Sequence, residues 1–264
     1  MIRDITIGQY YKADSVIHRL DPRVKLMGTL IFIISLFMGM NIWIYAVVTV
    51  ALAVVIKMSR IPLKFMVRGL KSIVILIIIS AVFLTPGDVL IQIWKLTITY
   101  QGLKMAIFMV VRLIYLIVGT SLMTLTTTPN NLTDGLEKGL GFLKVIKVPV
   151  HEIAMMMSIA LRFIPILIEE TDKIMKAQMA RGADFENGSL IKRAKAMVPI
   201  LVPLFISAFR RANELAMAME ARCYHGSEGR TKMKPLKYEK RDRIAYISMV
   251  LYLGVIIIVK IIAA

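Results

Sequence analysis

The chain has 264 residues, of which 58% are hydrophobic, and its mean hydropathy is +0.71. This is more apolar than an ordinary soluble domain, so the composition indicates an integral membrane protein. The formal net charge is +17, and the single cysteine excludes an internal disulfide bond.

Five apolar runs predict about five transmembrane helices. Several runs are shorter than the ~20 residues that an untilted spanning helix needs, so we expect flanking Lys and Arg side chains to snorkel. Gly39 and Asn41 separate the first two runs, which predicts a tight helical hairpin in place of one overlong helix. The runs are Leu26–Met40, Ile42–Ile56, Ser72–Leu84, Met105–Leu125 and Ile244–Val259.

Two further apolar stretches, Ile153–Ile168 and Met197–Phe209, each continue into a charged helical pattern. A bilayer core would not accept these charges, so we expect helices that lie at the membrane boundary or pack beneath it. The predicted fold class is therefore an all-α polytopic membrane protein, with about five transmembrane helices and long cytoplasmic or interfacial coupling helices.

The distribution of charge predicts the orientation in the membrane. Residues 57–71 carry five basic residues and no acidic one, whereas residues 85–104 carry two Lys and one Asp. By the positive-inside rule the first stretch is cytoplasmic, the second is external and the N-terminus is cytoplasmic. The opening residues do not resemble a signal peptide.

We expect three regions: an N-terminal transmembrane region (1–128), a cytoplasmic coupling-helix region (129–243) and a C-terminal transmembrane helix (244–264).

The strong positive charge allows several interpretations. Topology together with attraction to anionic membrane lipids accounts for most of the basic residues. Docking of a soluble partner is the other interpretation. Nucleic acid is a poor partner, because the sequence has no recognised nucleic-acid module and its basic residues flank apolar runs.

The sequence offers little catalytic chemistry. Its three histidines, His18, His151 and His225, are too scattered to suggest a metal site, and no phosphate-binding GxxxxGK[ST] string occurs. We therefore predict no catalytic residues, no cofactor and no metal. The acidic string at residues 169–172 is interpreted as a solvated helix face, because Glu169 precedes Lys173 and Asp172 precedes Lys176 by four residues.

One phrase occurs twice, as "AQMARGADF" at residues 177–185 and as "AMEARCYHG" at residues 218–226. The first follows a helix predicted from Pro149 to Gly182, and the second follows a helix predicted from about Lys192 to near Arg222. Small alanines allow a partner surface to approach closely. An arginine at a helix C-terminus interacts favourably with the helix dipole and offers five donors in a rigid fork. The pattern suits insertion into an acidic or carbonyl-lined groove.

Here the sequence resembles the transmembrane coupling subunits, the T components or EcfT/CbiQ family, of energy-coupling factor importers for vitamins and metals. The resemblance covers essentially the whole chain. It rests on four strings: "HRLDPRVKL" (18–26), "LRFIPILIEE" (161–170), "AQMARGAD" (177–184) and "RANELAMAMEARCY" (211–224). Cys223 stands where the second motif usually has glycine, which argues against a strict requirement for glycine's positive φ at that position.

The resemblance implies a non-catalytic subunit of the prokaryotic inner or plasma membrane, with three kinds of neighbour. Two ATP-binding-cassette ATPase subunits would receive the two helix ends, a substrate-binding membrane S component would carry the cargo, and lipids would surround the subunit. A polytopic membrane enzyme and a stand-alone permease are the alternatives. The residues implied to dock the ATPases are Ala180, Arg181, Gly182, Glu220, Ala221, Arg222 and Cys223.

Overall fold

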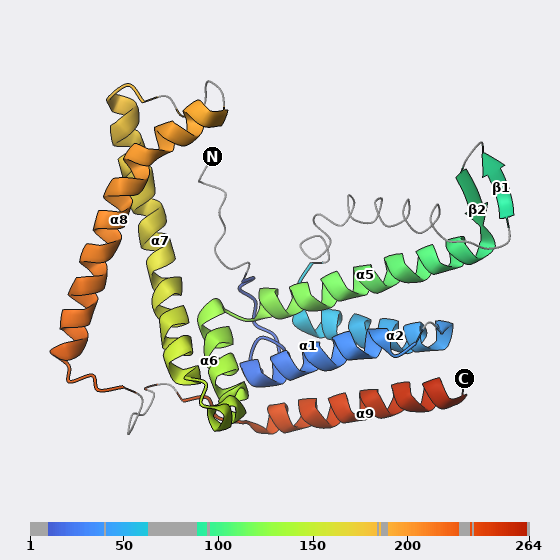
Figure 1. Ribbon diagram of the computed structural model, residues 1–264. Coiled ribbons are helices and arrows are strands. Elements are labelled where there is room, and N and C mark those ends of the chain that lie inside the picture. The colour runs from blue at the N-terminus through green and yellow to red at the C-terminus, as the bar shows by residue number, and fades with distance from the viewer. Residues whose placement is uncertain are drawn as a thin grey trace. The chain divides into compact units, whose positions relative to one another are not determined.

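The computed structural model describes residues 10–39, 41–62, 89–93, 96–183, 185, 190–226, 233 and 235–262, which are mainly helical (Figure 1). The chain divides into two compact units. One unit contains Leu136–Pro235, and we call it the helix-pair unit. The other contains Gly8–Gly135 and Leu236–Ala264, and we call it the bundle unit.

Two helices separated by a short break open the bundle unit. Helix α1 spans Pro22–Phe37 and helix α2 spans Ile42–Ser59. The side chain of Asn41 accepts a hydrogen bond from the backbone N–H of Trp43 at 3.2 Å and so caps the start of α2. The predicted interruption of the first apolar stretch is therefore confirmed.

Two longer helices complete the described part of the bundle unit, α5 (Tyr100–Thr126) and α9 (Lys240–Ile262). The predicted all-α polytopic class is confirmed. The structure adds a small antiparallel hairpin that the sequence analysis did not predict, formed by β1 (Val89–Ile93) and β2 (Leu96–Thr99). The predicted transmembrane run Ser72–Leu84 lies outside the described residues.

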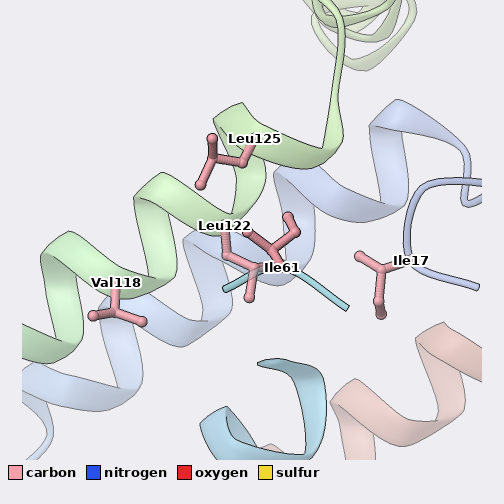
Figure 2. Packing of buried hydrophobic residues seen from close by; sticks show 5 residues of the cluster. All are labelled: Ile17, Ile61, Val118, Leu122 and Leu125. Carbon is pink, nitrogen blue, oxygen red and sulfur yellow. The ribbon is translucent and has the colours of Figure 1, made fainter. Parts of the chain in front are cut away.

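Two apolar clusters hold the bundle unit together at opposite ends of its helices. Figure 2 shows the first cluster, where α2 and α5 end. The second cluster lies where α1 and α9 end and α2 begins. The buried members are Ile17, Ile61, Val118, Leu122 and Leu125 in the first cluster, and Leu36, Ile44, Tyr45, Val48 and Ile256 in the second.

A buried polar cluster joins the start of α1 to the start of α9. Asp21 caps α1, because its carboxylate accepts from the backbone N–H of Arg23 at 2.9 Å. The same carboxylate forms an ion pair with the Arg23 guanidinium at 2.9 Å, and that guanidinium lies 3.8 Å from the centre of the Tyr238 ring. The Asp21 side chain is only 3% exposed, so this ion pair is largely shielded from water.

Asp242 and Lys25 extend this cluster, which we call the polar junction. The buried carboxylate of Asp242 accepts from the backbone N–H groups of Asp21 at 2.9 Å and Glu239 at 2.8 Å. Lys25 is also buried, and its ammonium group donates to the carbonyl of Thr126 at 2.8 Å. The polar junction thus connects α1, α5 and α9 at one end of the bundle unit.

The helix-pair unit is dominated by two long helices, α7 (Val150–Ala180) and α8 (Leu190–Glu220). They follow α6 (Pro129–Gly139), which crosses the boundary between the units, and the 3₁₀ helix η2 (Gly141–Ile146). The long helices begin and end close to the positions that the sequence predicts, and both continue through their internal prolines.

Four helices in the described residues are long and apolar enough to cross a membrane: Ile42–Ser59, Lys104–Thr126, Val150–Ala180 and Lys240–Ile262. Helix α1 has only 16 residues, which is short for an untilted span. Helix α7 meets the same criteria, although the sequence analysis interpreted its apolar part as interfacial. The chain is therefore a polytopic membrane protein with mainly helical structure.

Candidate functional site

Helices α7 and α8 form an antiparallel, crossing pair within their unit (Figure 1). Near the end of α7, the side-chain amide of Gln178 donates to the carbonyl of Pro199 at 3.4 Å. Further along α8, the guanidinium of Arg211 donates to the carboxylate of Glu170 at 3.2 Å. From the first contact to the second, the residue number falls on α7, from 178 to 170, and rises on α8, from 199 to 211. The two helices therefore run in opposite directions.

The first repeated phrase forms a Schellman motif at the end of α7. The backbone N–H of Ala183 donates to the carbonyl of Gln178 at 3.0 Å, and that of Gly182 donates to the carbonyl of Met179 at 3.0 Å. Gly182 has a φ of +88°, which is the left-handed conformation that this motif requires. Arg181 is the C-cap, so its side chain leaves the helix at its last turn.

The second phrase forms the same motif at the end of α8. The backbone N–H of Tyr224 donates to the carbonyl of Met219 at 3.0 Å, and that of Cys223 donates to the carbonyl of Glu220 at 2.9 Å. Cys223 takes the left-handed position, with a φ of +53°. The positive φ is therefore present although the residue is not glycine, and Arg222 occupies the position equivalent to Arg181.

Both arginines are available for binding. Arg181 and Arg222 are exposed, and within the described residues neither guanidinium has a hydrogen-bonding or ion-pair partner. Ala180 and Ala221 beside them are also exposed, so each arginine stands on a surface of small side chains. The two helix ends can each present a planar, bidentate donor to an acidic or carbonyl-rich surface.

The two ends are far apart in the helix-pair unit. Each arginine lies 11 residues beyond the Glu170–Arg211 ion pair in its own helix (181 minus 170, and 222 minus 211). At a rise of 1.5 Å per residue, antiparallel axes place the two ends about 33 Å apart. The seven predicted docking residues therefore form two separate groups and not one composite site.

Sequence reasoning missed the ion pair at the crossing. Glu170 and Arg211 are 41 residues apart, which is the spacing of Arg181 and Arg222 (222 minus 181). This equality only places each arginine 11 residues beyond the pair, and no local sequence signal marks a contact that depends on how two helices pack. Glu169 with Lys173 and Asp172 with Lys176 form no ion pair among the described residues, and the ion pair of this acidic string is that of Glu170 with Arg211 on α8.

An apolar stripe follows one side of α8 before its charged end. Its side chains are 44% to 68% exposed and recur at four-residue steps, so they share a helix face. We call it the α8 stripe: Met197, Val198, Leu201, Val202, Phe205, Ile206 and Phe209. An exposed apolar surface of this extent is typical of contact with a membrane or a protein partner.

No cluster of three or more metal-binding side chains occurs in the part of the chain that the structure describes. The exposed Cys223 is free and belongs to the second helix end.

A family model described as "Cobalt transport protein", CbiQ, matches residues 13–233. That match includes both helix ends and most of the bundle unit. The chain belongs to the CbiQ family.

It is also similar to curated proteins named energy-coupling factor transporter transmembrane protein EcfT. The relative from Clostridium kluyveri is 57% identical over 250 residues, 93% of each chain. The relatives from Ruminiclostridium cellulolyticum and Bacillus subtilis are 54% and 47% identical over at least 92% of each chain.

Membership of the CbiQ family confirms the resemblance stated from the sequence motifs. It also agrees with the several apolar helices of sufficient length to span a membrane. The roles of Arg181 and Arg222 are not part of these comparisons and remain predictions.

Proposed function

We propose that this chain is the transmembrane coupling subunit of an energy-coupling factor importer. In this proposal it links ATP binding and hydrolysis by two ATPase subunits to uptake through a substrate-binding S component. The observation that carries the proposal is the pair of helix ends built by the same motif, each with an exposed arginine at the C-cap that has no partner among the described residues. The subunit itself is non-catalytic, and the ATPases hydrolyse ATP.

Each helix end would insert into a groove on one ATPase. The neighbouring alanines permit close approach, and the guanidinium provides several donors in one plane. Because the two ends are about 33 Å apart by helical rise, they suit two separate ATPase subunits. Movement of one ATPase relative to the other would then change the crossing of α7 and α8.

The α8 stripe would contact the S component. A membrane-embedded partner offers apolar surface, and the stripe exposes large aliphatic and aromatic side chains such as Phe205 and Phe209. Substrate would be bound by the S component, and the class of cargo is vitamins or metal ions. A polytopic enzyme or a solitary permease would leave both arginine-capped ends without a role.

Co-purification of the ATPases with the arginine variants tests the proposal. Arg181→Ala and Arg222→Ala should each weaken ATPase binding by ~2 to 5 kcal/mol, as truncation at buried interfacial charge pairs does. A loss of ~2 kcal/mol corresponds to about 30-fold weaker binding. The double variant should lose the ATPases more completely, because the two linked contacts reinforce each other. Lysine at either position should restore binding only partly.

Arg210→Ala is the matched control, because Arg210 is an exposed arginine within α8 and away from the helix end. This variant should retain the ATPases. Normal assembly and uptake by the double variant would show that Arg181 and Arg222 do not dock the ATPases. Equal loss from Arg210→Ala would instead indicate a diffuse basic surface.

The proposed orientation has a cytoplasmic N-terminus, with the helix ends on the same side as the ATPases. It is supported by the charge difference between residues 57–71 and 85–104. Reporters fused at Lys64 and after Gly226 should be cytoplasmic, and a reporter at Asp88 should be external. The reverse pattern would place the helix ends on the wrong side for ATPases.

A further inference from the structure

A basic pocket of about 530 Å³ lies in the bundle unit, outside the two helix ends. Residues from three segments line it: the segment before α1, the end of α2 and the start of α9. Among the described residues that line the pocket, four are cationic and one is acidic, which gives them a formal charge of +3. The cations are Arg19, Lys57, Arg60 and Arg241, and the acid is Asp14.

The walls of the basic pocket are held by buried contacts. The backbone N–H of Tyr11 donates to the carbonyl of Leu125 at 2.9 Å, which fixes the segment before α1 against α5. Ile17 and Ile61 each lie within two residues of a pocket cation and are buried in the apolar cluster of Figure 2. The cations therefore project from ordered backbone and not from free loops.

Two of the four cations form ion pairs with nearby carboxylates. Arg19 forms an ion pair with Asp14, and Arg241 forms one with Glu239. Within the described residues, Lys57 and Arg60 have no ion-pair partner. Like charges gathered in one pocket repel each other, and an anion that enters the pocket would relieve this repulsion.

The surface next to the basic pocket is apolar. On α2, Val54 is 52% exposed and Met58, which also lines the pocket, is 43% exposed. On α9, Ile244 and Ile247 are 66% and 61% exposed and lie within two turns beyond Arg241. A ligand that joins an anionic group to long apolar chains would match both surfaces, and basic pockets between transmembrane helices bind such headgroups.

We propose that the basic pocket binds the headgroup phosphate of an anionic phospholipid such as phosphatidylglycerol, with the acyl chains along α2 and α9. This inference depends on the membrane location of the chain and not on the proposed contacts with ATPases. Inorganic phosphate shares the anionic group but lacks the acyl chains, so the two ligands can be distinguished.

Native mass spectrometry of the delipidated full-length protein tests the proposal. The protein is titrated with phosphatidylglycerol, phosphatidylcholine, glycerol phosphate and inorganic phosphate in separate experiments. Phosphatidylglycerol should bind more tightly than phosphatidylcholine, and the two soluble phosphates should neither bind comparably nor displace it. The double variant Lys57→Gln/Arg60→Gln should bind phosphatidylglycerol about 30-fold more weakly, since each cation near a lipid surface contributes about a fivefold effect.

Two further variants keep the test independent of folding defects. Asp14→Asn removes the one acidic side chain of the pocket and frees Arg19, so it should bind phosphatidylglycerol about fivefold more tightly. Lys104→Gln/Lys260→Gln removes the same charge from exposed positions at the other ends of α5 and α9, and should leave the affinity unchanged.

Three results would overturn the proposal. One is equal binding of phosphatidylcholine and phosphatidylglycerol. The second is tight binding of inorganic phosphate, which would assign the pocket to a soluble anion. The third is a variant result that does not single out the pocket: an equal loss of affinity in the Lys104/Lys260 variant would reduce the effect to overall charge, and no gain in Asp14→Asn would exclude the pocket as the binding site.

Discussion

The carboxylate of Asp242 accepts a hydrogen bond from the backbone N–H of Asp21 at 2.9 Å, across 221 residues of sequence. Both residues are buried, at 2% and 6% exposure. The contact joins the start of α1, the first described helix, to the start of α9, the last. Asp21 belongs to the string "HRLDPRVKL", so that string has a structural role that the sequence comparison alone does not explain.

Asp242→Asn should lower the free energy of unfolding by about 2 kcal/mol. The two oxygens of Asp242 accept from two backbone N–H groups, whereas asparagine offers one oxygen and turns an NH₂ group toward the second donor. Chemical denaturation in detergent measures the effect. Asp172→Asn changes a partly exposed carboxylate on α7 and should alter stability by less than about 0.5 kcal/mol. If Asp242→Asn and Asp172→Asn are equally stable, the hydrogen bonds of Asp242 in the polar junction do not stabilise the fold.

Introducing glycine at one left-handed position and removing it from the other should change the stability of the two helix ends in opposite directions. Cys223→Gly should stabilise the end of α8 by about 1 kcal/mol, because a non-glycine residue in the left-handed conformation costs ~1 to 2 kcal/mol. Gly182→Ala should destabilise the end of α7 by a similar amount. A Cβ atom at Gly182 meets nothing within 4 Å, so the penalty comes from the backbone alone.

Hydrogen exchange at the amides of Ala183 and Tyr224 measures these two substitutions, since both amides close the Schellman motifs. Exchange at Tyr224 should slow in Cys223→Gly, and exchange at Ala183 should speed up in Gly182→Ala. Unchanged exchange in both variants would show that the left-handed positions do not limit the stability of the helix ends.

Spin labels can measure the separation of the two helix ends. With cysteines replacing Arg181 and Arg222 in a Cys223→Ser background, pulsed dipolar spectroscopy should give a distance of about 33 Å. The Glu170–Arg211 ion pair joins the two helices, and its partners are only partly exposed. Glu170→Arg should broaden the distance distribution, and adding Arg211→Glu should narrow it again. A much shorter distance in the starting protein would contradict the antiparallel arrangement.

Acidification should destabilise the segment that contains His18. Burial lowers the pKa of His18 below its usual 6.5, and nearby Lys25 lowers it further. The folded state therefore favours neutral imidazole, with Nε2–H donating to the carbonyl of Tyr11 and Nδ1 accepting from the hydroxyl of Ser15. The unfolded chain binds the proton more readily, so stability is present above pH ~6.5 and decreases as the pH falls toward the folded pKa.

Unfolding measured from about pH 7.5 to about pH 5.5 covers this transition. His18→Gln keeps an N–H donor for the carbonyl of Tyr11 but cannot titrate, so its stability should depend less on pH in that interval. The same pH dependence in both proteins would assign the effect to other groups.

The sequence predicts much of the helical structure because capping and stop residues leave local signals. Asn41 marks the start of α2, and Gly182 marks the end of α7. The sequence likewise predicts that both repeated phrases end a helix, and both do. The stop signal in the sequence is weaker at the end of α8 than at the end of α7, because Cys223 is not a usual residue for a positive φ.

Long-range pairing could not be predicted in the same way. Asp242 and Asp21 are adjacent only after the chain has folded, and periodicity carries no information about such a contact. The β1–β2 hairpin was missed for a different reason. Its strands Val89–Ile93 and Leu96–Thr99 are rich in β-branched residues, but strands this short give a weaker sequence pattern than long apolar helices.

The equal spacing of Glu170 to Arg211 and of Arg181 to Arg222 has a geometric consequence. In an antiparallel pair, one rotation of 180° about an axis through the ion pair exchanges the two helices and carries each arginine onto the other. The backbone positions of Arg181 and Arg222 would then be related by a local twofold axis, which is the symmetry of a closed dimer. If the two proposed ATPase partners are identical, Arg181→Ala and Arg222→Ala should weaken ATPase binding equally. If the two ATPases differ, the two substitutions should weaken ATPase binding unequally. The ratio of the two losses in affinity then measures how far the ATPase pair departs from twofold symmetry.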